Sequence, residues 1–176
     1  MAIAAVAIVV IVIVAAIGVL LISGSGTTEA NVSSTPAQMV LRIDDFPSGW
    51  QETEPWVIEP PIRACSDYNI SAFNTSTPYA AQIECIIVTY PTYERARQVY
   101  DEVMENWTTI TTTQIDDHFD RCVMYELDRG MYGKARYYDF QEKNVCGGIA
   151  ILTSLYYNMS ESWIDSLLSS VEGRIK

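Results

Sequence analysis

The sequence has little histidine and lacks the common catalytic motifs. It contains one histidine, His118, and it has no G-x-S-x-G motif and no glycine-rich phosphate loop. A Ser-His-Asp or Cys-His mechanism needs a nucleophile beside the imidazole, and no motif supplies one. No carboxylate pair is singled out for glycoside hydrolysis either. We therefore expect a protein that is not an enzyme, with no catalytic residue and no cofactor.

The sequence also contains few residues in a pattern that could bind a metal ion. One candidate is the run Asp116-Asp117-His118-Phe119-Asp120. Its spacing differs from the D-x-[DN]-x-[DN]-G calcium loop, and it leads into a predicted strand, where alternate side chains point to opposite faces. No two cysteines have C-x-x-C spacing, which disfavours zinc. We expect no metal site.

Lysine and arginine are absent before Arg42, and the first 22 residues are an unbroken apolar run, MAIAAVAIVVIVIVAAIGVLLI. A helix of this length is about 33 Å long, enough to cross a hydrocarbon layer of about 30 Å. A cleaved signal peptide would normally start with basic residues and have a shorter apolar core. We expect a transmembrane helix over residues 1–22, and the alternatives are a cleaved signal and the core of a pilin-like filament. The residues expected to contact lipid or other copies are Ile3, Ile8, Val12, Ala16 and Leu20.

Asparagine is scarce but strongly patterned. Five of the six asparagines begin an N-x-[ST] triplet, whereas the serine and threonine content would give about one by chance. This pattern indicates N-glycosylation on an exported surface, and the alternative is an accidental cluster in a chain rich in serine and threonine. The predicted acceptors are Asn31, Asn69, Asn74, Asn106 and Asn158.

Four cysteines, Cys65, Cys85, Cys122 and Cys146, all follow the apolar run. An even number beyond a membrane segment predicts two disulfides in an oxidising compartment. Of the three possible connectivities we favour Cys65–Cys85 with Cys122–Cys146. The second pair conflicts with a simple meander, because strands that flank a middle strand lie about 9–10 Å apart.

The net charge of −11 lies entirely beyond residue 28. An acidic surface disfavours nucleic acid and anionic lipid headgroups as partners. Residues 23–38 are rich in Gly, Ser and Thr and predict a flexible linker. Residues 39–176 are long enough for one domain with one core.

Apolar periodicity predicts the elements of this domain. A short strand or helical turn at 39–43 precedes a tight turn at 44–50, which Phe46 and Trp50 anchor. A short strand at 56–59 and a long surface loop at 62–79 follow. Strands are predicted at 80–90, 119–127, 134–141 and 145–155, and helices after the capping residues Thr92 and Ser160. The fold class is α+β: an antiparallel sheet with two helices on one face.

Several short motifs resemble a family of membrane-anchored extracytoplasmic domains of archaea and some bacteria, loosely similar to the PsbP-like fold. The matching segments are Asp45-Phe-Pro-Ser-Gly-Trp50, Ala96 in the predicted helix, Lys143-Asn144-Val145 and Ser160. The resemblance covers about residues 40–176. It implies an accessory, sensory or binding role and carries over no catalytic residue.

These features predict a single-pass membrane protein with its C-terminal domain outside the cell. The expected role is non-catalytic binding of a surface protein or glycan by an N-glycosylated domain. The alternative is a subunit of an extracellular filament whose core is the N-terminal helix. In either case the N-terminal helix contacts the bilayer or copies of itself.

Overall fold

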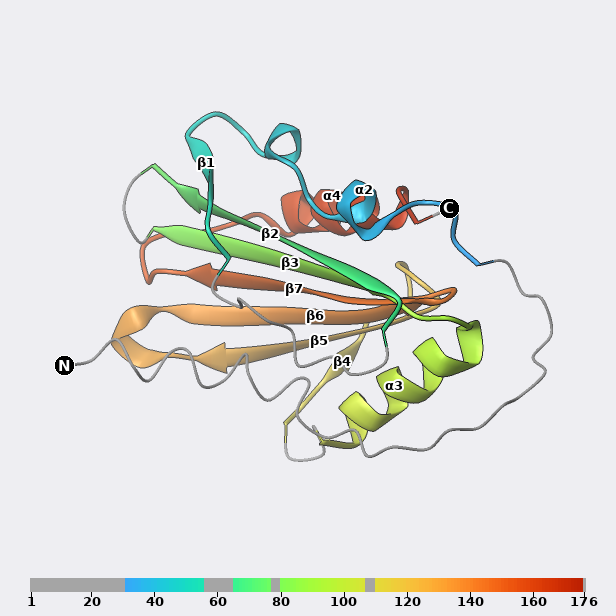
Figure 1. The fold of residues 1–176 in the computed structure, drawn as a ribbon. Helices are drawn as coiled ribbons and strands as arrows, with labels where there is room; N and C mark the ends of the chain where they lie inside the picture. Colours follow the sequence, from blue (N-terminus) through green and yellow to red (C-terminus); the bar gives the residue numbers. More distant parts are fainter. Residues whose placement is uncertain (1–30, 56–64, 77–79, 107–109, 176) are drawn as a thin grey trace.

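A computed structural model describes residues 31–55, 65–76, 80–106 and 110–175. They form an α+β domain around one seven-stranded antiparallel sheet of order β1-β2-β3-β7-β6-β5-β4 (Figure 1). The strands are β1 (Trp50–Thr53), β2 (Asp67–Thr75), β3 (Ala81–Thr89), β4 (Thr113–Gln114), β5 (Arg121–Asp128), β6 (Lys134–Glu142) and β7 (Val145–Thr153). The helices are α2 (Pro36–Met39), α3 (Tyr93–Asn106) and α4 (Glu161–Glu172), with 3₁₀ turns η2 (Ile43–Asp45) and η3 (Gly130–Tyr132).

The two long helices lie on opposite faces of the sheet, with α4 above it and α3 below it in Figure 1. The prediction that both helices cover one face is therefore wrong. The strands β3 and β7 bury apolar side chains on both faces of the sheet, so each face needs its own cover. Ile83 and Ile87 pack in the cluster that contains α4, whereas Ile86 and Val88 pack with α3.

The α4 face holds the larger core. Leu167, Leu168 and Val171 of α4 are buried with Phe73, Ile149 and other residues of the sheet. The segment before β1 joins this layer, because Arg174 pairs with Asp45 (Nη2 to Oδ1, 2.6 Å) and donates to Val40 O (2.8 Å). The predicted turn at 44–50 is confirmed: Gly49 has a φ of +97°, and the rings of Phe46 and Trp50 lie 5.0 Å apart.

Most of the strands and helices predicted from local sequence patterns are confirmed. The strands predicted at 80–90, 119–127 and 134–141 correspond to β3, β5 and β6 within two residues at each end. Thr92 Oγ1 accepts from Arg95 N (3.2 Å) and Ser160 Oγ from Trp163 N (3.3 Å), so both predicted helix caps are confirmed.

Three predicted boundaries are wrong. Residues 67–75 form β2 rather than part of a surface loop, since Phe73 and Ala72 are buried in register with β3. β7 ends at Thr153 instead of continuing to Leu155, which is exposed. Folded structure also begins before residue 39, because Pro36 starts α2 and is buried.

Several predictions fall outside the described residues. They are the apolar segment 1–22 with Ile3, Ile8, Val12, Ala16 and Leu20, the linker up to residue 30, and the short strand at 56–59. Within the part of the chain that the structure describes, no helix is both long enough and apolar enough to cross a membrane.

Candidate functional site

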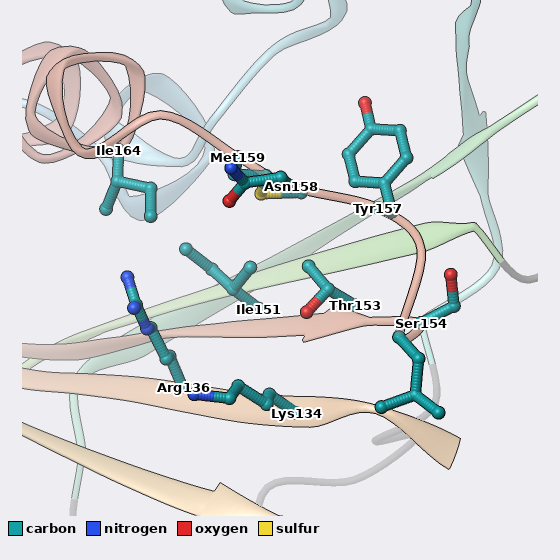
Figure 2. A pocket seen from close by; sticks show the side chains of 10 residues that line it. Lys134, Arg136, Ile151, Thr153, Ser154, Tyr157, Asn158, Met159 and Ile164 are labelled. Atoms are coloured by element: carbon teal, nitrogen blue, oxygen red, sulfur yellow. The ribbon is translucent and has the colours of Figure 1, made fainter. Parts of the chain in front are cut away.

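A pocket of about 260 Å³ opens at one end of the sheet, on the face that carries α4 (Figure 2). Its floor is formed by β6 and β7, and its rim by the segment that joins β7 to α4. The lining residues are Lys134, Arg136, Ile151, Thr153, Ser154, Leu155, Tyr157, Asn158, Met159 and Ile164. Alternation along β6 places Lys134 and Arg136 on this face, the side of Tyr138 and Phe140.

The two basic side chains of the pocket are held by acidic partners. Arg136 contacts Glu126 (Nε to Oε2, 2.7 Å) and Glu161 (Nη1 to Oε1, 2.6 Å), and Lys134 Nζ contacts Glu126 Oε1 (2.7 Å). Hydrogen bonds from Lys134 and Arg136 lower the pKa of Glu126, and those to Glu126 and Glu161 raise the pKa of Arg136. Two positive and two negative charges balance at the pocket, so it has no excess charge for a free anion or cation.

The lining contains both apolar and polar side chains. Among the described residues that form it there is no His, Cys, Asp or Glu. The lining combines apolar side chains with hydroxyl, amide and cationic groups, as sites for small polar ligands do. The pocket can hold and orient a ligand.

Next to the pocket, two loops expose large apolar side chains. Met131 and Tyr132 follow β5 and are 78% and 63% exposed, and Leu155 and Tyr156 follow β7 and are 59% and 97% exposed. We call these four residues the distal tip. The two loops are in contact: a Cβ on Gly133 would lie 1.9 Å from Thr153 O, and Gly133 has a φ of +92°. The tip and the pocket share Leu155.

The chain enters the domain at the opposite end of the sheet. Val32 N donates to Asn144 Oδ1 (2.9 Å) in the turn between β6 and β7. The pocket residue Lys134 lies at the far end of β6, whose nine residues span about 30 Å. The described structure therefore separates chain entry from the distal tip by the length of the sheet, as Figure 1 shows.

The imidazole of His118 lies between two carboxylates of α4. Its Nε2 is 2.8 Å from Asp165 Oδ1 and its Nδ1 is 3.1 Å from Glu172 Oε2. Burial lowers the pKa of His118, but hydrogen bonds to Asp165 and Glu172 outweigh burial, and the pKa lies above its usual value. When protonated, the ring donates from both nitrogens and so fastens the segment before β5 to α4.

The structure gives the acidic run around His118 a structural role. Phe119 has a φ of +56°, and its N–H donates to Glu172 Oε1 (2.7 Å). Asp120 Oδ2 accepts from Lys143 N (3.1 Å), whereas Asp116 and Asp117 are exposed. No group of three or more potential metal ligands occurs among the residues that the structure describes.

The predicted acceptor asparagines differ in accessibility. Asn31 and Asn158 are exposed, and they lie at opposite ends of the domain. Asn69 and Asn74 are half-buried in β2, and Asn74 Oδ1 is enclosed without a hydrogen-bond partner in the described part of the chain. The side chain of Asn106, at the end of α3, is outside the described part.

No disulfide joins any two of the four cysteines in the structure. The favoured pairings Cys65–Cys85 and Cys122–Cys146 are wrong, because each would join side chains on opposite faces of the sheet. Cys85 and Cys122 belong to the core on the α4 face, whereas Cys65 and Cys146 pack against the cluster on the α3 face. The strands of Cys122 and Cys146 do flank β6, as the meander required.

Sequence reasoning missed both the distal tip and the partners of His118. The tip had a local signal: large apolar residues directly follow the Asp128-Arg129-Gly130 turn and end the last strand. The partners of His118 had no such signal, because they lie 47 and 54 residues away in the sequence.

Comparison with known proteins gives little further information. No family model and no curated protein matches this chain. Among solved structures, the extracellular domain of PknH from Mycobacterium tuberculosis matches with a TM-score of 0.41 and 12% sequence identity. The match covers 61% of this chain and 64% of that domain's chain. Neither the PsbP-like resemblance nor the extracellular location is tested by this likeness, and both stay predictions.

Proposed function

We propose that the chain is a membrane-anchored, N-glycosylated cell-surface protein whose folded domain binds a partner without catalysing a reaction. The observation that carries the binding role is the distal tip beside the charge-balanced pocket. Soluble domains rarely expose a contiguous group of large apolar side chains unless these contact something. Tyrosine suits such contacts, since it offers a large rigid ring with a polar end.

The place of chain entry supports presentation of this tip away from the membrane. The predicted membrane segment and its linker join the domain beside Asn144, at the end of the sheet opposite Met131 and Tyr156. A tether at one end leaves the other end accessible to a partner in the surroundings. The pocket suits a small polar group of that partner, such as a sugar or a side chain of a surface protein.

The location rests on the sequence: the apolar segment 1–22 and the five N-x-[ST] triplets. A filament subunit with residues 1–22 as its core is the alternative, and the described residues contain no observation that favours it. The same segment would then contact copies of itself in place of the bilayer.

A photo-crosslinking amino acid at position 156, introduced into the full chain on intact cells, tests the proposal. Tyr68 is the matched control position, because it is a tyrosine 43% exposed on β2 and away from the tip. We expect a discrete adduct from position 156 and none from position 68. Equal labelling from both positions would contradict a binding role of the tip.

Location is checked on the same cells. External protease should digest the domain while leaving cytoplasmic markers intact, and glycopeptide analysis should find glycans on the exported chain. Full protection from external protease would contradict the surface location. Release of polymers without detergent would favour the filament.

A further inference from the structure

The acceptor triplet Asn158-Met159-Ser160 forms part of the rim of the pocket. Asn158 is exposed and lines the pocket, and Figure 2 shows its side chain on the rim segment, opposite the strands that form the floor. This residue lies in the irregular stretch between β7 and α4, whereas Asn69 and Asn74 lie in the paired strand β2. Connecting segments at the surface are accessible to enzymes that modify side chains. Asn158 is therefore an accessible acceptor at the edge of the pocket.

The backbone on both sides of Asn158 is held in place. Met159 is buried in the core beneath α4, and Tyr157 N donates to Ser154 O (3.2 Å). Ser160 is the N-cap of α4, and its hydroxyl accepts a hydrogen bond from a backbone N–H of the first turn (3.3 Å). A sugar attached to Asn158 therefore starts from a fixed point beside the pocket.

The pocket is small compared with a glycan. Its volume of about 260 Å³ lies below the usual range for ligand sites, about 300–1,000 Å³, whereas an N-linked glycan is bulky. The lining includes the hydroxyl groups of Thr153 and Ser154 and the ammonium group of Lys134, with which sugar hydroxyls can form hydrogen bonds. The first sugars of a glycan on Asn158 therefore fit over the mouth of the pocket.

We propose that an N-glycan on Asn158 covers the pocket, so that only molecules without this glycan bind a partner there. The inference rests on the proposed function, because it concerns the regulation of the same binding surface. Leu155 of the distal tip lines the pocket together with Asn158, so the glycan also shields part of the tip. The extent of glycosylation at one residue then sets the fraction of molecules that can bind.

The modification is the transfer of an oligosaccharide from a lipid-linked sugar phosphate. Nδ2 of Asn158 forms a bond to C1 of the first sugar, and the bond between C1 and the phosphate oxygen breaks. The lipid phosphate leaves with the electron pair of that bond, and one amide proton of Asn158 passes to a base of the transferase. The amide stays uncharged, so the charge balance of the pocket is kept and the effect of the glycan is steric.

The first test measures access to the pocket without a partner. Lys134 lines the pocket with a side chain that is 56% exposed, whereas Lys143 lies at the opposite end of β6 and β7. The full chain, purified from its own cells, is treated with an amine-acylating reagent, and glycopeptide analysis of the same sample gives the occupancy of Asn158. We expect the glycan to slow the reaction of Lys134 in proportion to this occupancy and to leave Lys143 unaffected.

Two variants without the glycan complete this test. Ser160→Gly removes the acceptor triplet but keeps Asn158 and a residue type that is favoured at N-caps, and Asn158→Gln removes the acceptor itself. Both variants should speed the reaction of Lys134 relative to Lys143. Ser160→Thr keeps the triplet and the cap, so it is the matched control and should not. Unchanged rates in both variants, or an unmodified Asn158 in the native protein, would overturn the proposal.

The second test links the cover to binding. With a photo-crosslinking amino acid at position 156 on intact cells, the Asn158 glycan should be depleted from the crosslinked molecules and retained in the others. Asn31, at the opposite end of the domain, is the internal control and should have equal occupancy in both populations. Equal occupancy of Asn158 in both would overturn this inference and leave the binding role supported. The absence of any adduct, even from Ser160→Gly, would reject the proposed function and the regulation with it.

Discussion

The ring of Phe140 lies over Gly147 on the neighbouring strand. The two residues are partners in the β6–β7 register, and a Cβ on Gly147 would lie 2.4 Å from Phe140 Cζ and 2.7 Å from Ile86 O. The other side of the Phe140 ring stacks on Phe119, with the centroids 4.0 Å apart. Gly147 therefore makes room for a ring at the centre of the core beneath α4.

Gly147→Ala should destabilise the domain, because the added methyl group meets a fully buried ring and a backbone carbonyl that cannot both move. Overpacking of a dense core costs about 1–3 kcal/mol. Gly173→Ala is the matched control, since its Cβ would approach only Ser169 O, at 3.2 Å. Denaturant unfolding followed by tryptophan fluorescence measures both variants. An equal free energy of unfolding for Gly147→Ala and the unmodified protein would contradict this packing.

Gly148, the next residue along β7, leaves room for a buried carboxyl group on the opposite face of the sheet. Asp139 is fully buried there against Gly148, whose Cβ would lie 3.0 Å from Asp139 Oδ1. Burial raises the pKa of Asp139 to about 7, although a hydrogen bond with Tyr125 lowers it. The carboxyl group is therefore more easily ionised in the unfolded chain than in the folded one.

Asp139→Asn should stabilise the protein at pH 8. A raised carboxyl pKa means that the folded state binds more protons between about pH 4 and pH 7, so stability falls as pH rises through this range. Asparagine removes this dependence, and the shift corresponds to a gain on the order of a few kcal/mol at pH 8. Denaturant unfolding at several pH values is the measurement. A variant no more stable than the original at pH 8, or a gain equally large at pH 4, would argue against a buried ionised carboxylate.

The sequence was sufficient where the signal was local. The stripe Ala96, Val99 and Tyr100 predicted the buried face of α3, and β-branched runs predicted the central strands. β2 was missed because Asp67, Asn69 and Ser71 interrupt its apolar pattern. The first four residues of the strand are exposed or half-buried, so polar side chains are tolerated there. Polar composition alone does not distinguish such a strand from a loop.

Relationships between distant segments could not be read from the sequence. The cysteine pairing was predicted from proximity in the chain, whereas the side of the sheet that each cysteine faces decides which pairs can meet. That side depends on strand register, and a shift of one residue would reverse it. The choice of face for α3 and α4 has the same origin, since an amphipathic stripe shows that a helix covers a sheet but not which side it covers.

The contact of His118 with α4 predicts a loss of stability as pH rises. The direction is the same as for Asp139, but the cause is hydrogen bonding to carboxylates instead of burial. The pKa of His118 lies above its usual value, so its contribution to stability is fully present below about pH 6.5. This contribution is lost as pH rises through the raised pKa. His118→Gln should therefore cost more stability at pH 6 than at pH 9, and comparison of the two proteins cancels the effect of Asp139. Asp117→Asn, at an exposed neighbour, is the control and should show no such trend. The same cost at pH 6 and pH 9 would contradict a charged imidazole between Asp165 and Glu172.

Exposure predicts which acceptor asparagines carry glycans. Asn31 is exposed and should be modified in most molecules, whereas Asn69 and Asn74 are half-buried in β2 and should be modified rarely. A transferase must reach the side-chain amide, and the paired strand β2 holds Asn74 with its oxygen enclosed. Glycopeptide mass spectrometry of the native protein gives the occupancy of each site. Higher occupancy at Asn74 than at Asn31 would mean that glycans are added before β2 pairs with β3, and exposure in the folded domain would then not control the pattern.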